Sequence, residues 1–338
     1  MTSQKPVVVV AELSGNHGND LARTRDTLQA MAEAGADAIK LQTYRAESLT
    51  LDLDTGPFRP RSSGPWKGRT AFDVFTEGAL PYEWHEELFA MAASLGMQCF
   101  SSPFDVEGVD FLEGLGTPTY KVASFEIRHV PLLERIAATR KPVIVSTGIA
   151  SLADIELALD VLGRERDDIT LLKCTSAYPT PVDEVDLLTI PTLRAAFGVD
   201  VGLSDHTMGH VVPVAAVALG ATLIEKHFVL DRTAGGIDAS FSLEPHEFKQ
   251  MVEAVRVAEA ALGSSVYRLG PASQAASSRG RSIFVAKHVA RGETLTEDNL
   301  RVVRPGDGLH PIHYSTLLGR SVRVDVEAGT PLSWDLVE

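Results

Sequence analysis

The sequence predicts an α/β protein, in which a (β/α)8 barrel is followed by a small, mostly β domain. The first observation is that eight short apolar runs occur within residues 1–230, and such runs are typical of parallel strands buried on both faces. The second is that stretches with helical spacing separate most of these runs. The third is a change after residue 262, where short, turn-rich segments replace the alternation. These patterns favour one TIM-type barrel and a separate C-terminal domain within 338 residues.

The predicted strands are the eight apolar runs, taken in chain order. They cover residues 7–13, 38–43, 98–104, 119–124, 143–148, 169–174, 201–206 and 223–228. Between and after them, apolar residues recur every three or four positions, which indicates the buried face of a helix. These predicted helices cover residues 21–34, 84–95, 130–138, 152–162, 188–197, 211–219 and 245–262. Gly35, Gly96 and Gly220 follow three of them at positions typical of helix ends.

Two segments interrupt this pattern. Residues 47–81 are rich in Gly, Pro and Arg, and we expect them to form a functional loop or lid rather than core. Residues 263–281 contain Gly, Ser, Ala and Pro with few large apolar side chains, which is typical of a linker. The predicted domains are therefore a barrel over residues 1–262 and a small β domain over residues 282–338, joined by that linker.

The composition narrows the function classes. Lys and Arg number 31 against 45 Asp and Glu, and the net charge of −14 argues against general nucleic-acid binding. No apolar run reaches about 18 residues and no signal peptide is recognisable, so we expect a cytoplasmic protein without membrane contact. Cys99 and Cys174 lie in apolar, strand-like runs, and we expect buried thiols rather than a disulfide.

Polar side chains follow the apolar part of all eight predicted strands. In a barrel of this kind the active site is built at the carboxyl ends of the strands. The residues that we single out there are Glu12, Lys40, Gln42, Ser102, Lys121, Ser124, Glu126, Ser176, Tyr178, Ser204, His206 and His227. A purely structural barrel has little need of such a ring, so the pattern predicts a binding or catalytic site.

His206 and His227 end the seventh and eighth predicted strands. Because neighbouring strands lie ~4.8 Å apart, the two imidazoles could share one divalent cation, with water or substrate completing its shell. Two histidines with oxygen ligands suit Mn²⁺, Fe²⁺, Co²⁺ or Zn²⁺, and the spacing does not choose among them. The alternative is a pair of core histidines bonded to backbone carbonyl groups.

Lys40 and Lys121 each lie within a strand of alternating apolar residues, where an ammonium group needs a partner. A phosphate or carboxylate ligand would supply it, with serine hydroxyls as further donors. Lys121 could instead form a Schiff base with a carbonyl substrate. The third alternative is structural pairing with Glu12 or Glu126, carboxylates that could otherwise orient a substrate or move a proton. Asp238, beyond the last strand, could bind sugar hydroxyls or only close a turn.

Seven motifs occur in a fixed order along the chain. They are Ala-Glu-Leu-Ser-Gly-Asn-His, Ala-Asp-Ala-Ile-Lys-Leu-Gln-Thr, Phe-Ser-Ser-Pro-Phe-Asp, Tyr-Lys-Val-Ala-Ser-Phe-Glu, Val-Ser-Thr-Gly, Gly-Leu-Ser-Asp-His-Thr and Ile-Glu-Lys-His-Phe. In order and spacing they resemble the sialic acid synthase family across essentially the whole chain. Residues 282–338, with Arg-Pro-Gly-Asp-Gly, resemble its C-terminal antifreeze-like (SAF) domain. Further runs, among them Pro-Trp-Lys-Gly, are most similar to the pseudaminic acid branch of that family.

The resemblance implies a role for each matching residue. The positions that match phosphoenolpyruvate ligands are Lys40, Ser102, Lys121, Ser124, Ser176 and Ser204. His206 and His227 match ligands of a divalent metal, Mn²⁺ first with Co²⁺ or Mg²⁺ as alternatives, and Glu12 matches the carboxylate beside the metal and the reacting carbons. The positions that match contacts to the amino sugar are Gln42, Glu126, Tyr178 and Asp238. Arg304 matches an arginine that the SAF domain inserts into the partner's site in a domain-swapped homodimer.

Two residues depart from the family patterns. Ser176 stands where sialic acid synthases usually have Asn, which favours the pseudaminic branch, and Pro65 stands where that branch usually has Leu. The resemblance implies a metal-dependent synthase that joins phosphoenolpyruvate to an open-chain 2,4-diacetamido-2,4,6-trideoxyhexose, with C–O cleavage and release of phosphate. The alternatives are a synthase of sialic or legionaminic acid, a Schiff-base pyruvate lyase, or a non-catalytic carbohydrate-binding protein.

Overall fold

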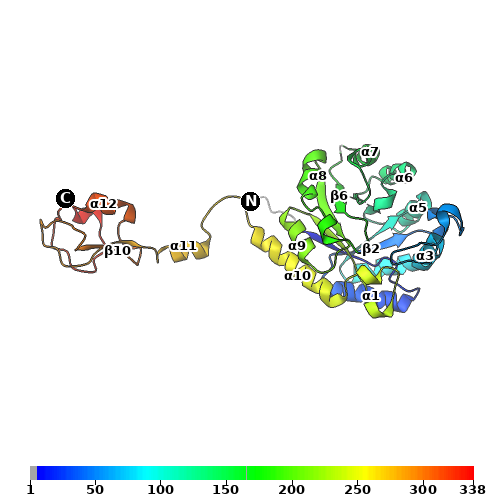
Figure 1. Ribbon diagram of the computed structural model, residues 1–338, viewed down its shortest axis with the longest axis horizontal. Coiled ribbons are helices and arrows are strands. Elements are labelled where there is room, and N and C mark those ends of the chain that lie inside the picture. The colour runs from blue at the N-terminus through cyan, green and yellow to red at the C-terminus, as the bar shows by residue number, and fades with distance from the viewer. Residues whose placement is uncertain (1–5, 165) are drawn as a thin grey trace. The chain divides into compact units, whose positions relative to one another are not determined.

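The structure is a computed structural model that describes residues 6–164 and 166–338. It divides the chain into two compact units, one ending at Gly263 and one spanning Ser264–Glu338. In the first unit, eight parallel strands close into a barrel in chain order, which confirms the predicted fold class (Figure 1). The strands are β1 (Val8–Glu12), β2 (Ala38–Thr43), β3 (Gln98–Pro103), β4 (Tyr120–Val122), β5 (Val143–Ser146), β6 (Ile169–Cys174), β7 (Asp200–Asp205) and β8 (Leu223–His227).

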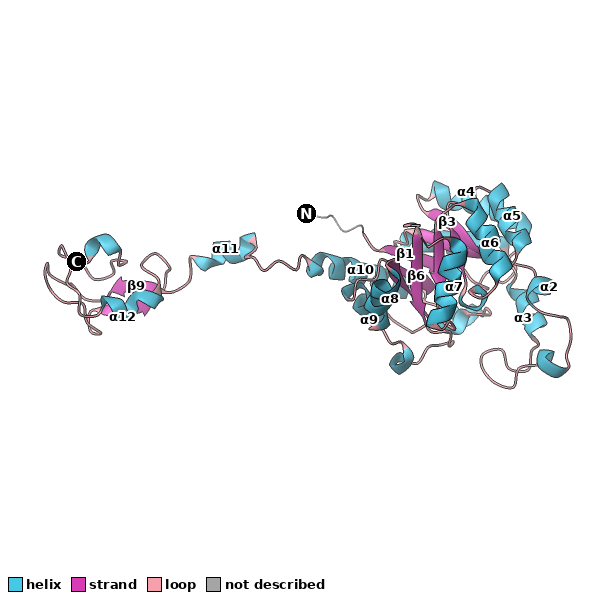
Figure 2. Ribbon diagram, turned by 90° about the horizontal axis from the view of Figure 1, so that it is seen from above, coloured by secondary structure: helices cyan, strands magenta, loops and turns pink. Residues whose placement is uncertain are grey.

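Helices surround the barrel on its outside, as Figure 2 shows. They are α1 (Leu21–Glu33), α4 (His85–Ser94), α5 (Val106–Gly114), α6 (Val130–Thr139), α7 (Leu152–Leu162), α8 (Thr189–Phe197), α9 (Val211–Ala218) and α10 (Pro245–Leu262). All of these except α5 lie within a residue or two of a predicted helix. The helix α5 follows β3 almost directly and is capped by Asp105, whose side chain accepts a hydrogen bond from the Gly108 backbone N–H.

Strand side chains form two apolar layers. Outward-facing residues such as Val9, Ile39 and Val145 are fully buried against the helices and form the main core. A second, smaller layer crosses the barrel interior, and its members are Val10, Ala38, Phe100, Ile144, Leu172 and Leu223. This inner layer fills the barrel below the site, as is usual in this fold.

The segment between β2 and α4 is more ordered than the sequence predicted. Residues 47–81 were expected to form a loop, but they contain most of α2 (Ala46–Leu49) and all of α3 (Ala71–Gly78). The helix α3 begins with a reciprocal cap, because the Thr70 and Asp73 side chains each bond to the other residue's backbone N–H. The segment expected to form a functional loop or lid therefore contains helical parts.

The C-terminal unit has its own small core. The strands β9 (Ser282–Val285) and β10 (Leu300–Val303) pair in antiparallel fashion, and α12 spans Tyr314–Leu317. Ile283, Leu300 and Leu317 belong to its fully buried apolar cluster. Ahead of it, α11 (Pro271–Ser277) lies within the predicted linker and buries none of its residues. Throughout the described part of the chain, no helix combines the length and apolar character needed to cross a membrane.

Candidate functional site

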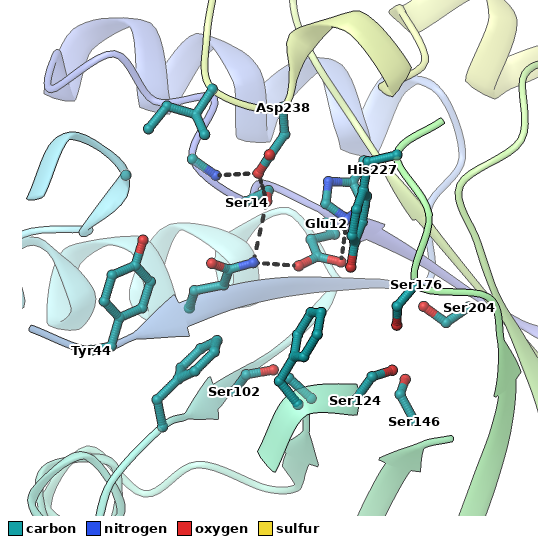
Figure 3. A pocket seen from close by; sticks show the side chains of 18 of the residues that line it. Glu12, Ser14, Tyr44, Ser102, Ser124, Ser146, Ser176, Ser204, His227 and Asp238 are labelled. Carbon is teal, nitrogen blue, oxygen red and sulfur yellow. Dashed lines mark hydrogen bonds and ion pairs between the residues drawn. The ribbon is translucent and has the colours of Figure 1, made fainter. Parts of the chain in front are cut away.

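A cavity of about 440 Å³ opens at the carboxyl ends of the barrel strands (Figure 3). Every predicted site residue of the first unit lines it: Glu12, Lys40, Gln42, Ser102, Lys121, Ser124, Glu126, Ser176, Tyr178, Ser204, His206, His227 and Asp238. Arg304 follows β10 in the C-terminal unit, so its role at the site stays a prediction. The strand-end pattern in the sequence therefore identified one contiguous pocket.

The alternation of strand side chains explains why these residues share one cavity. Residues two positions apart on a strand face the same side. Val10 belongs to the inner apolar layer, and Glu12 lies two residues further along β1. Leu223 and Glu225 on β8 repeat this relation. The apolar layer inside the barrel is therefore followed, towards the carboxyl ends of the strands, by a layer of polar side chains.

The strand register then places opposite charges beside each other. Glu12 is opposite Lys40 on β2 and opposite His227 on β8. Glu12 Oε2 lies 2.9 Å from Lys40 Nζ and 3.3 Å from His227 Nε2. Because all three side chains are almost fully buried, little solvent screens these interactions. The predicted pairing of a lysine with Glu12 is confirmed for Lys40.

Glu225, near the end of the eighth strand, received no role from the sequence, yet it lies at the centre of these charges. Its Oε1 atom lies 2.8 Å from Lys40 Nζ and 3.6 Å from Lys121 Nζ, and it accepts a hydrogen bond of 3.0 Å from Ser204 Oγ. Its Oε2 atom is buried and has no hydrogen-bond partner among the described residues. The signal that could have identified Glu225 was its position between Leu223 and His227 on the inward face.

The two lysines differ in their electrostatic surroundings. Burial alone would lower the pKa of Lys40, but the adjacent Glu12 and Glu225 carboxylates outweigh it and raise that pKa. Burial lowers the pKa of Lys121, and Glu225 compensates only in part. Lys121 Nζ donates to Ser146 Oγ at 2.7 Å. An anion bound beside Lys121 would add the negative charge that this ammonium group lacks.

Serine hydroxyls near Lys121 have unused hydrogen-bonding capacity. Ser102 Oγ and Ser176 Oγ are buried without a partner in the described part of the chain. Ser124 Oγ accepts a hydrogen bond of 3.1 Å from the Gly148 backbone N–H. A side chain at Gly148 would collide with the Ser176 hydroxyl, so only glycine keeps this space open. Unpaired buried hydroxyls that share a cavity with an ammonium group indicate a site for an anionic ligand.

The two histidines lie side by side, with ring centroids 5.1 Å apart. His206 Nδ1 lies 3.2 Å from the Thr175 carbonyl oxygen, which leaves its Nε2 atom for another ligand. His227 Nδ1 is buried and has no partner among the described residues. The alternative, in which backbone carbonyls hold both histidines, therefore explains only the contact of His206 Nδ1. The positions of the two rings fit a cation shared between them.

No cluster of three or more His, Cys, Asp or Glu side chains around a metal-sized space occurs in residues 6–164 and 166–338. Two imidazoles with open positions are typical of a catalytic rather than a structural metal site. The cysteines Cys99 and Cys174 are free and buried, as expected.

A second group of polar residues in the cavity is linked by hydrogen bonds. Gln42 Nε2 donates to Glu12 Oε1 at 2.8 Å and to Ser14 Oγ at 3.2 Å, and Ser14 Oγ in turn donates to Asp238. The Tyr178 ring lies 4.5 Å from the His206 ring. This chain of amides, hydroxyls and carboxylates offers both donors and acceptors, as binding of a sugar requires.

Glu126 differs from the other carboxylates of the cavity. Burial raises its pKa from 4.5 to about 7, although Lys121 and the backbone partly oppose this shift. Its Oε2 atom has no hydrogen-bond partner among the described residues. The predicted alternative in which Glu126 pairs with a lysine is wrong, because Lys40 and Lys121 pair with Glu12 and Glu225 instead.

Aromatic residues from the segment between β2 and α4 also reach the cavity. Trp66 lines it, donates from Nε1 to the Ile237 carbonyl oxygen at 3.1 Å, and lies 6.1 Å from the Tyr178 ring. Trp84 does not line it and packs against His17 with ring centroids 6.2 Å apart. The segment is therefore part of the site's wall.

Comparison with known proteins agrees with this geometry. A model of the NeuB family matches residues 27–267, and a model of the SAF domain matches residues 280–338. The pseudaminic acid synthase of Helicobacter pylori is 42% identical over 336 residues, which are 99% of this chain and 98% of that protein. The N,N'-diacetyllegionaminic acid synthase of Campylobacter jejuni is 36% identical over 321 residues, covering 94% of this chain and 96% of that protein.

A solved structure extends the comparison to three dimensions. The N-acetylneuraminic acid synthetase of Leptospira borgpetersenii, in complex with citrate, superposes with a TM-score of 0.73 at 30% identity. The match covers 80% of this chain and 90% of that one. The fold, the motif order and the matched length agree, and the chain belongs to the NeuB family.

Proposed function

We propose that the protein is a nonulosonic acid synthase that condenses phosphoenolpyruvate with an open-chain 2,4-diacetamido-2,4,6-trideoxyhexose to give pseudaminic acid and phosphate. The similarity to relatives named as synthases of pseudaminic and legionaminic acid supports the assignment to nonulosonic acid synthases. The sequence identity is higher to the pseudaminic acid synthase, which supports pseudaminic acid as the product. The observation that carries the proposal is that the unpaired Ser102 and Ser176 hydroxyls line the same cavity as Lys121, which together match the needs of a small ligand with two anionic groups.

Phosphoenolpyruvate would occupy the deep end of the cavity. Its carboxylate and phosphate groups require at least two fixed cations, and Lys40 and Lys121 are the lysines that line the cavity. Ser102, Ser124 and Ser176 would donate to its oxygens. Glu225 would hold the two ammonium groups in place between turnovers, because it contacts both of them.

A divalent metal, Mn²⁺ in our proposal, would be held by His206 and His227, with Co²⁺ or Mg²⁺ as alternatives. Such an ion would supply Lewis-acid polarisation of the acceptor aldehyde. The chain's own contribution is to fix the two imidazoles: the Thr175 carbonyl orients His206, and the Glu12 carboxylate lies beside His227.

The bond changes follow from the two substrates. C3 of phosphoenolpyruvate attacks the acceptor aldehyde carbon, and the aldehyde oxygen gains a proton. Water then adds at C2, and the tetrahedral product expels phosphate by breaking the C2–O bond. Glu12, fixed by Lys40 and Gln42, is positioned to orient that water, and Gln42, Glu126, Tyr178 and Asp238 would bind the acceptor.

Two parts of the proposal concern the wider protein. Arg304 would enter the site of a second copy in a domain-swapped homodimer and contact the acceptor there. The protein would act in the cytoplasm on small-molecule substrates, without nucleic acid or membrane partners.

The test is phosphate release from phosphoenolpyruvate with a panel of acceptors, each with and without Mn²⁺. The panel contains 2,4-diacetamido-2,4,6-trideoxyhexoses of different stereochemistry and N-acetylmannosamine. The proposal predicts Mn²⁺-dependent release that is fastest with a diacetamido acceptor. Release with N-acetylmannosamine alone would reassign the product to a sialic acid. Borohydride trapping of a pyruvate adduct would instead support a Schiff-base lyase.

A further inference from the structure

One side of the cavity combines apolar rings with a single free hydroxyl. We call it the Tyr44 notch and define it by Tyr44, Phe75, Gly78, Phe104 and Ile237, all of which line the cavity. Phe75 and Gly78 belong to α3, in the segment for which a loop was predicted. In Figure 3, Tyr44 lies on the side of the cavity away from Ser176 and Ser204. The notch is therefore on the other side of the cavity from these two hydroxyls.

The Tyr44 hydroxyl has no partner within the described part of the chain. The residue is only 5% exposed, and its ring packs edge-on against Phe104 at 5.0 Å and Phe75 at 6.1 Å between centroids. Because Tyr44 lines the cavity, its hydroxyl is open to a ligand there, and the hydroxyl of a largely buried tyrosine normally has a hydrogen-bond partner. A ligand group in the cavity would provide that partner.

Gly78 permits this placement of the hydroxyl. A Cβ atom at Gly78 would come within 2.8 Å of the Tyr44 hydroxyl and within 3.2 Å of Ile237 Cδ1. The backbone conformation of Gly78 does not itself require glycine. The absence of a side chain at this position is thus explained by the close approach of Tyr44 and Ile237.

The chemistry of the notch selects among ligand groups. A sugar hydroxyl brings a donor as well as an acceptor, and the other side chains that define the notch, Phe75, Phe104 and Ile237, accept no hydrogen bond. A second anion would lie near the Asp238 carboxylate, which lines the same cavity. A neutral acyl group has a carbonyl oxygen that only accepts and a methyl group that packs against aromatic rings. The acyl group therefore fits best.

We propose that the Tyr44 notch binds one acetamido group of the acceptor sugar, with the Tyr44 hydroxyl donating to the acyl oxygen and the methyl group contacting Phe75 and Phe104. This inference rests on the proposed function and identifies residues that select an acylated acceptor. It makes α3 and the residue that directly follows β2 joint determinants of acceptor choice.

The experiment compares acceptors and variants in steady-state phosphate release. The acceptors are the diacetamido sugar and its two mono-amino analogues, each lacking one acetyl group. Tyr44→Phe removes the hydroxyl alone, and Tyr82→Phe is its control, because Tyr82 is half-buried but outside the cavity. Gly78→Ala displaces the hydroxyl. Its control is Gly114→Ala, since Gly114 also ends a helix and a Cβ atom there meets nothing within 4 Å.

We expect Tyr44→Phe and Gly78→Ala to lower kcat/KM for the diacetamido acceptor about tenfold or more, with KM for phosphoenolpyruvate unchanged. With one of the two mono-amino acceptors the penalty of Tyr44→Phe should vanish, which identifies the bound acyl group. An equal penalty with all three acceptors, or a change in KM for phosphoenolpyruvate only, overturns the inference while leaving the proposed function intact. If the wild-type protein turns over none of the acceptors, the proposed function fails and the inference fails with it.

Discussion

The raised pKa of Glu126 makes a quantitative prediction about stability. A carboxyl whose pKa is about 7 when folded and 4.5 when unfolded binds its proton more tightly in the folded state. Its contribution to stability is therefore present below pH 4.5 and is lost as the pH rises towards 7. Each pH unit between the two values is worth ~1.4 kcal/mol, so the ionised group costs the folded state about 3 kcal/mol above pH 7.

Glu126→Gln removes this titration while keeping the size and shape of the side chain. Between pH 5 and pH 8, the free energy of unfolding of the variant should rise by about 2–3 kcal/mol relative to wild type. Urea unfolding followed by circular dichroism at both pH values measures the difference. Glu134→Gln, an exposed position on α6, is the control and should show no such change. If Glu126→Gln changes the free energy of unfolding by the same amount at pH 5 and pH 8, the Glu126 carboxyl does not have the raised pKa given above.

Three further predictions concern the roles of individual site residues. Lys121→Met should raise KM for phosphoenolpyruvate about a hundredfold and leave KM for the acceptor nearly unchanged, because it removes a buried cation; equal changes in both constants would contradict this. His206→Ala should abolish Mn²⁺-dependent phosphate release without changing the midpoint of urea unfolding. Retained activity would show that His206 does not hold the metal. Arg304→Ala should raise KM for the acceptor about tenfold. Undiminished activity after deletion of residues 282–338 would exclude that role.

The barrel could be predicted because its signal is repeated. Each strand is a continuous apolar run bounded by polar residues, so errors were confined to the ends, as at β4, which is Tyr120–Val122 rather than residues 119–124. The segment between β2 and α4 was harder, because α3 is only 8 residues long and follows a stretch rich in glycine. Its cap, Thr70 with Asp73, was the signal that could have revealed it.

Most members of the site could also be predicted, but of its pairings only that of a lysine with Glu12 was among the expected alternatives. Strand ends meet at one rim in any closed parallel barrel, so their polar residues had to share a cavity. The partner of Lys40 depends on which residues lie opposite each other once β8 closes against β1. That register is a property of the whole barrel, and it places Glu225 rather than Glu126 beside the lysines. The sequence around a single strand does not specify which residues lie opposite each other in the closed barrel.

The most direct test of the central claim follows the bridging oxygen of phosphoenolpyruvate. The full-length protein would be given phosphoenolpyruvate labelled with ¹⁸O at that oxygen, the diacetamido acceptor and Mn²⁺, and both products would be analysed by mass spectrometry. We expect all of the ¹⁸O to leave with phosphate, because water attacks C2 of phosphoenolpyruvate and the bond between C2 and the bridging oxygen breaks. Label found in the sugar acid would contradict the proposed chemistry of the cavity.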